Sequence, residues 1–286
     1  MANEREHLRR VRNYYEVTQP FYRLFWHGPT LGLHYGFWDG QVSNRYQAIE
    51  RENEVLADLV DAKNGELVLD SGCGIGGSSL WLAQERGASV VGIDVVQKQL
   101  TKARELAQAR RLTQRVSFKE GDYQKLKFDP NMFDVYWSLE SLEHATNVEK
   151  VIEEAHRVLK PGGRIVIAAT FKSRNSLSSE ELRQLRIGMS AAGCFNDFRI
   201  AEKVAGAMEQ TGFVDVKNLN KTDDVMNSAR QMTIMCQLGL PFAKAGAALH
   251  LTSPILILNN QWGTYQEGLF KSGATSYNVL LGAKPK

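Results

Sequence analysis

The residues best suited to chemistry stand in a glycine-rich run, VLDSGCGIGGSS, over residues 68–79. Its glycines Gly72, Gly74 and Gly76 let the backbone turn tightly and approach a ligand closely. Asp94 follows a second apolar run, SVVGID, where a carboxylate can accept hydrogen bonds from two ribose hydroxyls. This combination predicts a binding site for a cofactor that contains adenosine.

Two kinds of cofactor fit that description, nicotinamide dinucleotides and S-adenosylmethionine. Asp70 directly precedes the glycines, where a carboxylate favours the ammonium of the methionine moiety and repels a pyrophosphate. Asp122, in EGDYQKL, is placed to accept a hydrogen bond from the adenine amino group. Both acids favour S-adenosylmethionine, with S-adenosylhomocysteine as product, over the cofactor of an NAD-dependent oxidoreductase. A non-catalytic protein that only binds the cofactor is a third possibility, which no sequence feature supports.

Methyl transfer needs alignment of donor and acceptor, and an acceptor that loses a proton also needs a base. Glu140 and His144, in SLESLEHA, follow an apolar run and lie about one helical turn apart, which makes both candidate catalytic residues. The alternatives are a structural hydrogen bond for Glu140 and an ordinary helix-start histidine. Glu143, between them, is interpreted as a solvated or capping acid.

The stretch GLHYGFWDG, residues 32–40, is unusually aromatic for a loop. His34 is a further candidate catalytic residue, with simple packing as the alternative. Tyr35 and Trp38 are predicted to contact the substrate, as is Tyr14 from the aromatic segment 14–28. That segment either forms a lid over the site or packs against the rest of the protein or a second subunit.

The middle of the chain alternates apolar strands with helices. This rhythm predicts a doubly wound, Rossmann-like α/β fold with a parallel sheet covered on both faces. Strands are expected at 66–70, 89–94, 116–122, 133–139 and 164–170, with helices at 77–87, 97–112 and 147–159, the last of them stopped by KPGG.

The outer segments predict the domain organisation. Residues 1–60 are expected to form an N-terminal helical lid, and residues 61–170 the cofactor-binding core. Residues 171–286 should complete the sheet, through a unit at 201–219 and a last strand at 277–282, and should carry a helical substrate cap at about 222–260. Ligands of such sheets bind at the carboxyl ends of the strands, beneath the expected cap.

The motifs VLDSGCGIGG, GID, EGDY, FDVYWSLESLEHA and VLKPGGR together resemble the class I S-adenosylmethionine-dependent methyltransferases over about residues 66–170. The resemblance implies a seven-stranded sheet whose last strand is antiparallel. It also implies the part of the cofactor that each residue contacts: the methionine half for Asp70, Gly72, Gly74 and Gly76, the ribose for Asp94 and Gln99, and the adenine for Asp122 and Tyr123.

Within that family the chain looks nearest to the sterol, gamma-tocopherol and terpenyl C-methyltransferase group. WSLESLEHA, LHYGFWDG and EGLFKSGATSYNVLLGAKP carry this likeness. The N-terminal Gly-Trp-Gly signature of the sterol enzymes is not matched, so the acceptor itself does not carry over. We expect C-methylation of a terpenoid, sterol-like or prenylated aromatic acceptor. O- or N-methylation of a secondary metabolite or quinone remains the alternative.

The composition of the chain limits the kinds of partner that the protein is expected to bind. The chain has 286 residues and a formal net charge of only +3, and it has no clustered basic run, which argues against nucleic acid. The longest apolar run, PILIL, is too short to span a bilayer, and MANEREHLRR is not a signal peptide. We therefore expect a cytoplasmic protein with a small lipophilic substrate, which could form a homo-oligomer through its aromatic N-terminal helix.

No metal site is expected. Cys73, Cys194 and Cys236 are widely spaced and show no ligand pattern, which indicates free thiols in a reducing compartment. An acceptor that carries a diphosphate would change this expectation, because it would need converging basic side chains and a magnesium ion. The candidates for such a cluster are Arg12, Arg23, Lys172 and Arg174.

Overall fold

The computed structural model describes residues 2–191 and 199–286, so Cys194 lies outside the described residues. Its centre is a seven-stranded sheet in the order β3-β2-β1-β4-β5-β7-β6, and only β7 runs antiparallel to its neighbours. The predicted fold class is confirmed, including the antiparallel last strand. The strands are β1 (Leu67–Ser71), β2 (Ser89–Asp94), β3 (Val116–Glu120), β4 (Phe133–Leu139), β5 (Leu159–Lys172), β6 (Val214–Asn220) and β7 (Thr275–Ala283).

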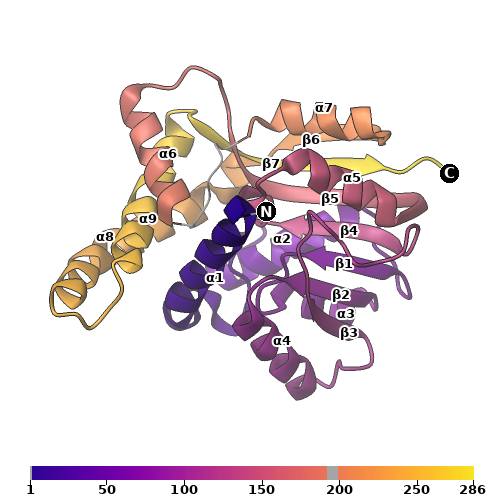
Figure 1. The fold of residues 1–286 in the computed structure, drawn as a ribbon, viewed down its shortest axis with the longest axis horizontal. Helices are drawn as coiled ribbons and strands as arrows, with labels where there is room; N and C mark the ends of the chain where they lie inside the picture. Colours follow the sequence, from indigo (N-terminus) through magenta and orange to yellow (C-terminus); the bar gives the residue numbers. More distant parts are fainter. Residues whose placement is uncertain (1, 192–198) are drawn as a thin grey trace.

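Helices flank and cap this sheet (Figure 1). The α-helices are α1 (Ala2–Tyr22), α2 (Arg45–Leu59), α3 (Gly77–Glu85), α4 (Gln97–Ala109), α5 (Val148–Val158), α6 (Ser179–Ala191), α7 (Ala201–Thr211), α8 (Thr222–Ala248) and α9 (Ile255–Lys271). A π-helix, η1 (Arg23–His27), and a 3-10 turn, η2 (Gly28–Thr30), continue α1, and a second 3-10 turn, η3 (Leu142–His144), follows β4. Helices in these ranges are too short or too polar to cross a membrane.

Alternate residues of the central strands enter two separate cores. Val68 and Trp137 belong to the core that contains α2, α3 and α4, whereas Leu69 and Tyr136 belong to the core that contains α5 and α7. Successive side chains of a strand point to opposite faces, so a strand that is apolar throughout must be covered on both. The uninterrupted apolar runs of the sequence are therefore explained by burial on both sides of the sheet.

Two boundaries lie at least five residues from the sequence-based expectation. The run LKPGG belongs to β5, because Leu159 pairs with Phe133 and Gly162 turns the chain with a φ of 77°. LKPGG ends helix α5, as expected, but β5 begins at Leu159, directly after the last helical residue. The cap also reaches further than residue 260, since α9 extends to Lys271 and α6 packs against it.

The cap lies to one side of the sheet. Helices α8 and α9 pack along each other, and α1 also contacts α9 (Figure 1). Ser173 N–H, just after β5, donates to Ala274 O, just before β7, which closes this end of the sheet beneath the cap. Segments from both ends of the chain thus meet beside the core.

Candidate active site

The glycine loop joins β1 to α3 with a left-handed backbone. Gly72 and Gly74 have φ angles of 85° and 55°, which side chains rarely adopt. A Cβ on Gly72 would lie 2.3 Å from Ser141 Cβ, so the loop passes close to the segment after β4. A Cβ on Gly74 would meet nothing nearer than 3.9 Å, because that residue faces open space. The loop therefore presents bare backbone toward a cavity.

Asp94 holds this loop from the end of β2. Its Oδ2 accepts from Gly74 N–H at 3.0 Å and its Oδ1 accepts from Val96 N–H at 2.8 Å. Burial raises the pKa of Asp94 to about 6 despite these bonds. The carboxylate keeps further acceptor capacity on the cavity side, which suits a pair of ribose hydroxyls.

Asp70 is the most buried acid beside the loop, with 3% of its surface exposed. Its Oδ2 accepts a hydrogen bond from Ser79 Oγ. Burial raises the pKa of Asp70 to about 7, and the nearby charge of Asp94 adds to the rise. A cationic ligand stabilises the ionised form of such a buried acid. The loop and its acids therefore fit an aminoacyl nucleoside such as S-adenosylmethionine.

The other expected cofactor residues lie along the same wall. Gln99, Asp122 and Tyr123 all line the cavity. Asp122 Oδ1 accepts from Gln124 N–H at 2.9 Å, and Tyr123 donates to Ser141 O at 2.9 Å. Gly76 lies just outside the lining, where a Cβ would come within 2.7 Å of Phe118 Cζ, so its role is to let the loop pack on β3.

One cavity of about 780 Å³ extends from this loop to the cap. The predicted Asp70, Gly72, Gly74, Asp94, Gln99, Asp122 and Tyr123 line it together with Glu140, His144, His34, Tyr14 and Tyr35. The wall on the cap side is mainly apolar and includes Met232, Met235, Phe242 and Leu256. Residues from both ends of the chain and from the core therefore share a single site.

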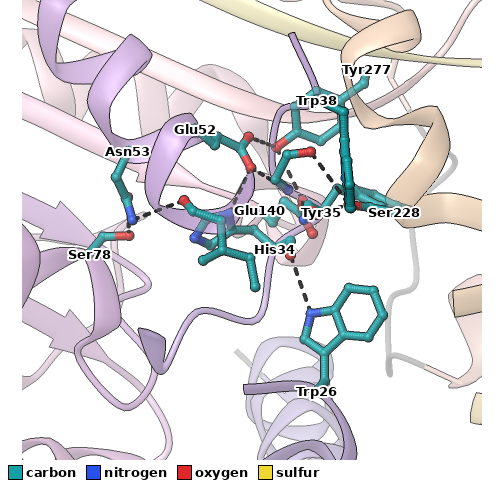
Figure 2. A network of polar contacts seen from close by, with 12 residues as sticks. Trp26, His34, Tyr35, Trp38, Glu52, Asn53, Ser78, Glu140, Ser228 and Tyr277 are labelled. Carbon is teal, nitrogen blue, oxygen red and sulfur yellow. Dashed lines mark hydrogen bonds and ion pairs between the residues drawn. The ribbon is translucent and has the colours of Figure 1, made fainter. Parts of the chain in front are cut away.

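A buried polar cluster lies beneath the stretch 32–40 (Figure 2). Glu52 of α2 is fully buried, and its Oε2 lies 2.7 Å from His34 Nδ1 and 2.9 Å from Gly36 N. Its Oε1 accepts from Tyr277 OH at 2.6 Å. His34 Nε2 is buried without a hydrogen-bond partner among the described residues, and it lies close to Gly32, although His34 belongs to the cavity lining.

Glu140 completes this cluster from the end of β4. Its Oε1 accepts from Tyr35 N–H at 2.9 Å and from Tyr277 OH at 3.1 Å (Figure 2). Its backbone has a φ of 46°, in the left-handed region that a glutamate rarely adopts. Burial, with the charges of Glu52 and Glu143, raises the pKa of Glu140 well above its usual range. Such a carboxyl group is a stronger base than an exposed one.

His144 is held by the N-terminal helix. Tyr15 OH lies 2.8 Å from His144 Nε2, and the two rings meet edge to face at 5.4 Å. His7 Nε2 lies 2.7 Å from the carbonyl oxygen of His144. Helix α1 thus covers the segment after β4 as the predicted lid would, and the domain boundaries remain a prediction.

The expectation for Glu143 was wrong. Its Oε1 accepts from Thr170 N–H at 3.1 Å, and its Oε2 is buried without a partner among the described residues. The 3-10 turn η3 directs this side chain toward β5 and away from solvent. Burial accordingly raises the pKa of Glu143 to about 7.

Replacing Glu143 by glutamine should flatten the pH dependence of stability. Because the pKa of Glu143 is higher in the folded state than in the unfolded state, ionisation of this carboxyl group makes the wild type lose stability as the pH rises from about 4.5 to about 7. This loss amounts to up to about 3 kcal/mol in the free energy of unfolding, and the variant should not show it. Urea unfolding at pH 5 and pH 8 measures this difference. Glu149→Gln, at an exposed position of α5, is the matched control, and equal pH dependence in wild type and Glu143→Gln would contradict the assignment.

The three predicted substrate contacts have different surroundings. Tyr35 lines the cavity, and its hydroxyl donates to Gln266 Oε1. Tyr14 also lines it, with its hydroxyl 2.6 Å from Asn259 Oδ1. Trp38 is not part of the lining: its indole N–H donates to Ser228 Oγ at 2.8 Å (Figure 2). Trp38 packs on α8 instead, where its backbone N–H also donates to Asp224 O.

Glu52 is the residue that sequence analysis missed. It sits in the acid-rich run ERENE, where it looks like one more solvated charge. The signal was its position: Ile49, Glu52 and Leu56 recur at helical spacing on the buried face of α2. A carboxylate within an apolar stripe needs buried partners, which here are the imidazole, the amide and the phenol described above.

The described ranges contain no group of three or more His, Cys, Asp and Glu side chains that could hold a metal ion. The basic residues considered for a diphosphate do not converge either. Arg12 pairs with Glu120 and Arg174 with Glu181, and no Arg or Lys is among the described residues that line the cavity.

Fold and site together define an α/β protein that binds an adenosine-containing cofactor. Residues 69–167 match the model of a family described as a methyltransferase domain. These residues are therefore similar to a methyltransferase domain, and the resemblance to the S-adenosylmethionine-dependent methyltransferases seen in the motifs is confirmed.

Two curated relatives and one solved structure support this placement. The methyltransferase GfsG of Streptomyces halstedii is 37% identical over 56% of this chain and 57% of its own. The sterol 24-C-methyltransferase erg6 of Aspergillus fumigatus is 31% identical over 88% of this chain and 64% of its own. The chain thus spans about three fifths of the length of these relatives. The cyclopropane synthase MmaA2 of Mycobacterium tuberculosis shares the fold, with a TM-score of 0.85 at 17% identity over 97% of this chain and 98% of its own.

Proposed function

We propose that this protein transfers a methyl group from S-adenosylmethionine to a lipophilic small molecule. The observation that supports this most directly is the shared cavity. One continuous wall contains the acids of the glycine loop, the carboxyl group of Glu140 and the apolar side chains of the cap. A polar cofactor and an apolar acceptor can therefore occupy it side by side, which is the alignment that methyl transfer needs.

When bound, the cofactor supplies an electrophilic methyl group. The chain supplies the rest: Glu140 accepts the proton that the acceptor loses, and Tyr35 N–H and Tyr277 OH hold that carboxyl group in place. His144, fixed by Tyr15, is the second candidate for this task. The aromatic side chains of α1 and η1 exclude water from the reacting atoms.

The preferred acceptor is an uncharged terpenoid, sterol-like or prenylated aromatic molecule that is methylated on carbon. The apolar cap wall suits such a body, and a relative named as a sterol 24-C-methyltransferase aligns with most of the chain. An acceptor with a diphosphate is disfavoured, because the described part of the lining offers no Arg or Lys.

O-methylation is the second candidate, and His34 is the observation that favours it. The imidazole of His34 is paired with a buried carboxylate, its other nitrogen has no partner among the described residues, and the residue belongs to the cavity lining; a hydroxyl acceptor that reaches this nitrogen can give it a proton. Carbon and oxygen methylation thus assign the base to different residues. The Glu140→Gln and His34→Gln variants separate the two.

Incubation with methyl-labelled S-adenosylmethionine and a panel of prenyl, sterol and phenol acceptors tests the function. Label should enter an apolar acceptor, and mass spectrometry of the product locates the methyl group on carbon or oxygen. Incorporation only into hydrophilic acceptors would refute the proposal. Stabilisation of the protein by NAD and not by S-adenosylmethionine or S-adenosylhomocysteine would refute the choice of cofactor.

Asp70→Asn is expected to weaken cofactor binding about tenfold to a hundredfold, the value of a charge-assisted hydrogen bond. Because the pKa of Asp70 is about 7 without ligand, a cationic ligand must displace a proton at lower pH. Wild-type affinity should therefore rise between about pH 5 and pH 8, and the variant should show a weaker dependence. Calorimetric titration in buffers of different ionisation enthalpy measures both affinity and proton release. Equal affinity of the two proteins would remove Asp70 from the site.

Three further expectations remain part of this proposal. Residues 1–60 would act as a lid and residues 222–271 as a substrate cap over the core of residues 61–170. Cys73 and Cys236 are free thiols, which is compatible with a cytoplasmic protein. Assembly through the N-terminal helix would involve its exposed face, since Tyr14 and Trp26 are buried within their own chain.

A further inference from the structure

Exposed apolar side chains gather around one end of the cavity. One group is Phe21, Leu24 and Phe25, from the end of α1 and from η1, and the other is Leu238, Phe242 and Leu251, from α8 and the turn after it. We call these six residues the apolar rim. Leu24, Phe242 and Leu251 are 74%, 80% and 76% exposed, which is unusual for side chains of this size. Phe21, Phe25, Leu238 and Phe242 also line the cavity, so the rim surrounds its opening.

Arg45 of α2 bridges the two elements, η1 and α8, that carry most of the rim. Arg45 donates from one guanidinium nitrogen to Phe25 O at 3.0 Å and from another to Met235 Sδ at 3.3 Å. Below the rim, Tyr22 donates to Asn259 Oδ1 at 2.7 Å, and α1 contacts α9 (Figure 1). The rim is therefore one surface built from two distant parts of the sequence.

The two segments that carry the rim contain basic residues and no acidic ones. The sequence has no acidic residue between Glu16 and Asp39, and none between Asp224 and Glu267. Arg23 and Lys244 are exposed within these two segments. Glu105 of α4 is an acidic neighbour of Arg23. A surface of large apolar side chains whose own segments carry only basic charges matches the interface of an anionic lipid bilayer, where apolar groups enter the acyl boundary and basic groups meet headgroups.

We propose that the apolar rim docks this protein onto the surface of an anionic lipid bilayer. A second copy of the chain fits the rim less well, because a two-fold contact would bring the basic side chains of both copies together. It would also cover the opening of the cavity. A bilayer instead places lipid-dissolved molecules at that opening; this advantage rests on the proposed function, whereas the docking itself does not.

Co-sedimentation with vesicles tests the docking without cofactor or acceptor, so its result is independent of methyl transfer. One set of vesicles is pure phosphatidylcholine and the other contains phosphatidylglycerol as well. The wild type should bind the anionic vesicles more strongly. Phe242→Asp and Leu24→Asp, on the two groups of the rim, should each reduce binding several-fold, and Lys244→Ala should weaken binding to the anionic vesicles by about fivefold.

Val214→Asp is the matched control, because Val214 is an exposed apolar residue of the edge strand β6, outside the rim. It should bind vesicles as the wild type does. The proposal is overturned if the wild type binds neither kind of vesicle, or if both rim variants bind like the wild type. It is also overturned if light scattering shows that the rim variants dissolve a dimer while vesicle binding stays unchanged. Circular dichroism of each variant verifies that it is folded.

Discussion

Replacing Glu140 by glutamine is expected to lower turnover by about 10²- to 10⁴-fold, the usual contribution of general acid–base catalysis. Glutamine keeps the length of the side chain and an oxygen that can accept from Tyr35 N–H and Tyr277 OH, so the pocket should keep its shape. What is lost is a carboxyl group whose pKa burial raises. The measurement is steady-state kinetics with the acceptor identified by the labelling experiment.

Cofactor affinity provides the control for this variant. The acids that we assign to the cofactor are Asp70, Asp94 and Asp122, so calorimetric titration should give nearly the same dissociation constant for Glu140→Gln and wild type. His34→Gln, measured in parallel, separates the two candidate bases. Turnover of Glu140→Gln equal to that of wild type would assign Glu140 a structural role and leave His34 or His144 as the base.

Replacing Glu52 by alanine is expected to destabilise the fold by about 3–5 kcal/mol, the cost of breaking a buried charged pair. The change removes the acceptor of three groups at once: His34 Nδ1, Gly36 N–H and Tyr277 OH. Each would be left buried without that partner, and a small void would form at the base of α2. Urea unfolding of the two proteins at one pH measures the loss.

Glu54→Ala is the matched control, because Glu54 lies on the same helix and its ion pair with Arg51 is about half exposed. It should change stability by less than about 1 kcal/mol. Glu52→Gln should fall between the two, since it keeps the shape and loses the charge. A loss of stability in Glu52→Ala no larger than in the control would show that the cluster around His34 does not stabilise the fold.

The sequence specified the sheet more fully than the site. Strands β2 and β4 have their predicted limits, because they are apolar throughout and each is followed by a helix. The residues of the glycine loop were also predictable, since their spacing along one βα unit fixes their location. The buried carboxyl groups of Glu52 and Glu143 were not, because burial of a carboxyl group depends on which distant segment covers it.

The surroundings of the cap were also only partly predictable from the sequence. Met232 and Met235 lie in the predicted substrate cap, and both line the cavity. The six residues of the rim, in contrast, look like ordinary helix interior in the sequence, and only the packing of α1 and η1 against the cap exposes them together. Trp38 illustrates the reverse case, because its place in an aromatic loop suggested a substrate contact and its position in the structure is against α8.

The stretch 32–40 joins three parts of the molecule. Phe37 N–H donates to Ala48 O of α2 at 2.9 Å, Trp38 N–H donates to Asp224 O of α8 at 2.8 Å, and Ser228 Oγ donates to Tyr35 O. Anyone who exchanges the cap to obtain a new acceptor range must therefore transplant this loop together with α8. In a chimera that keeps the old loop, the new helix would lack its anchor and the glutamate at the end of β4 would lose its alignment.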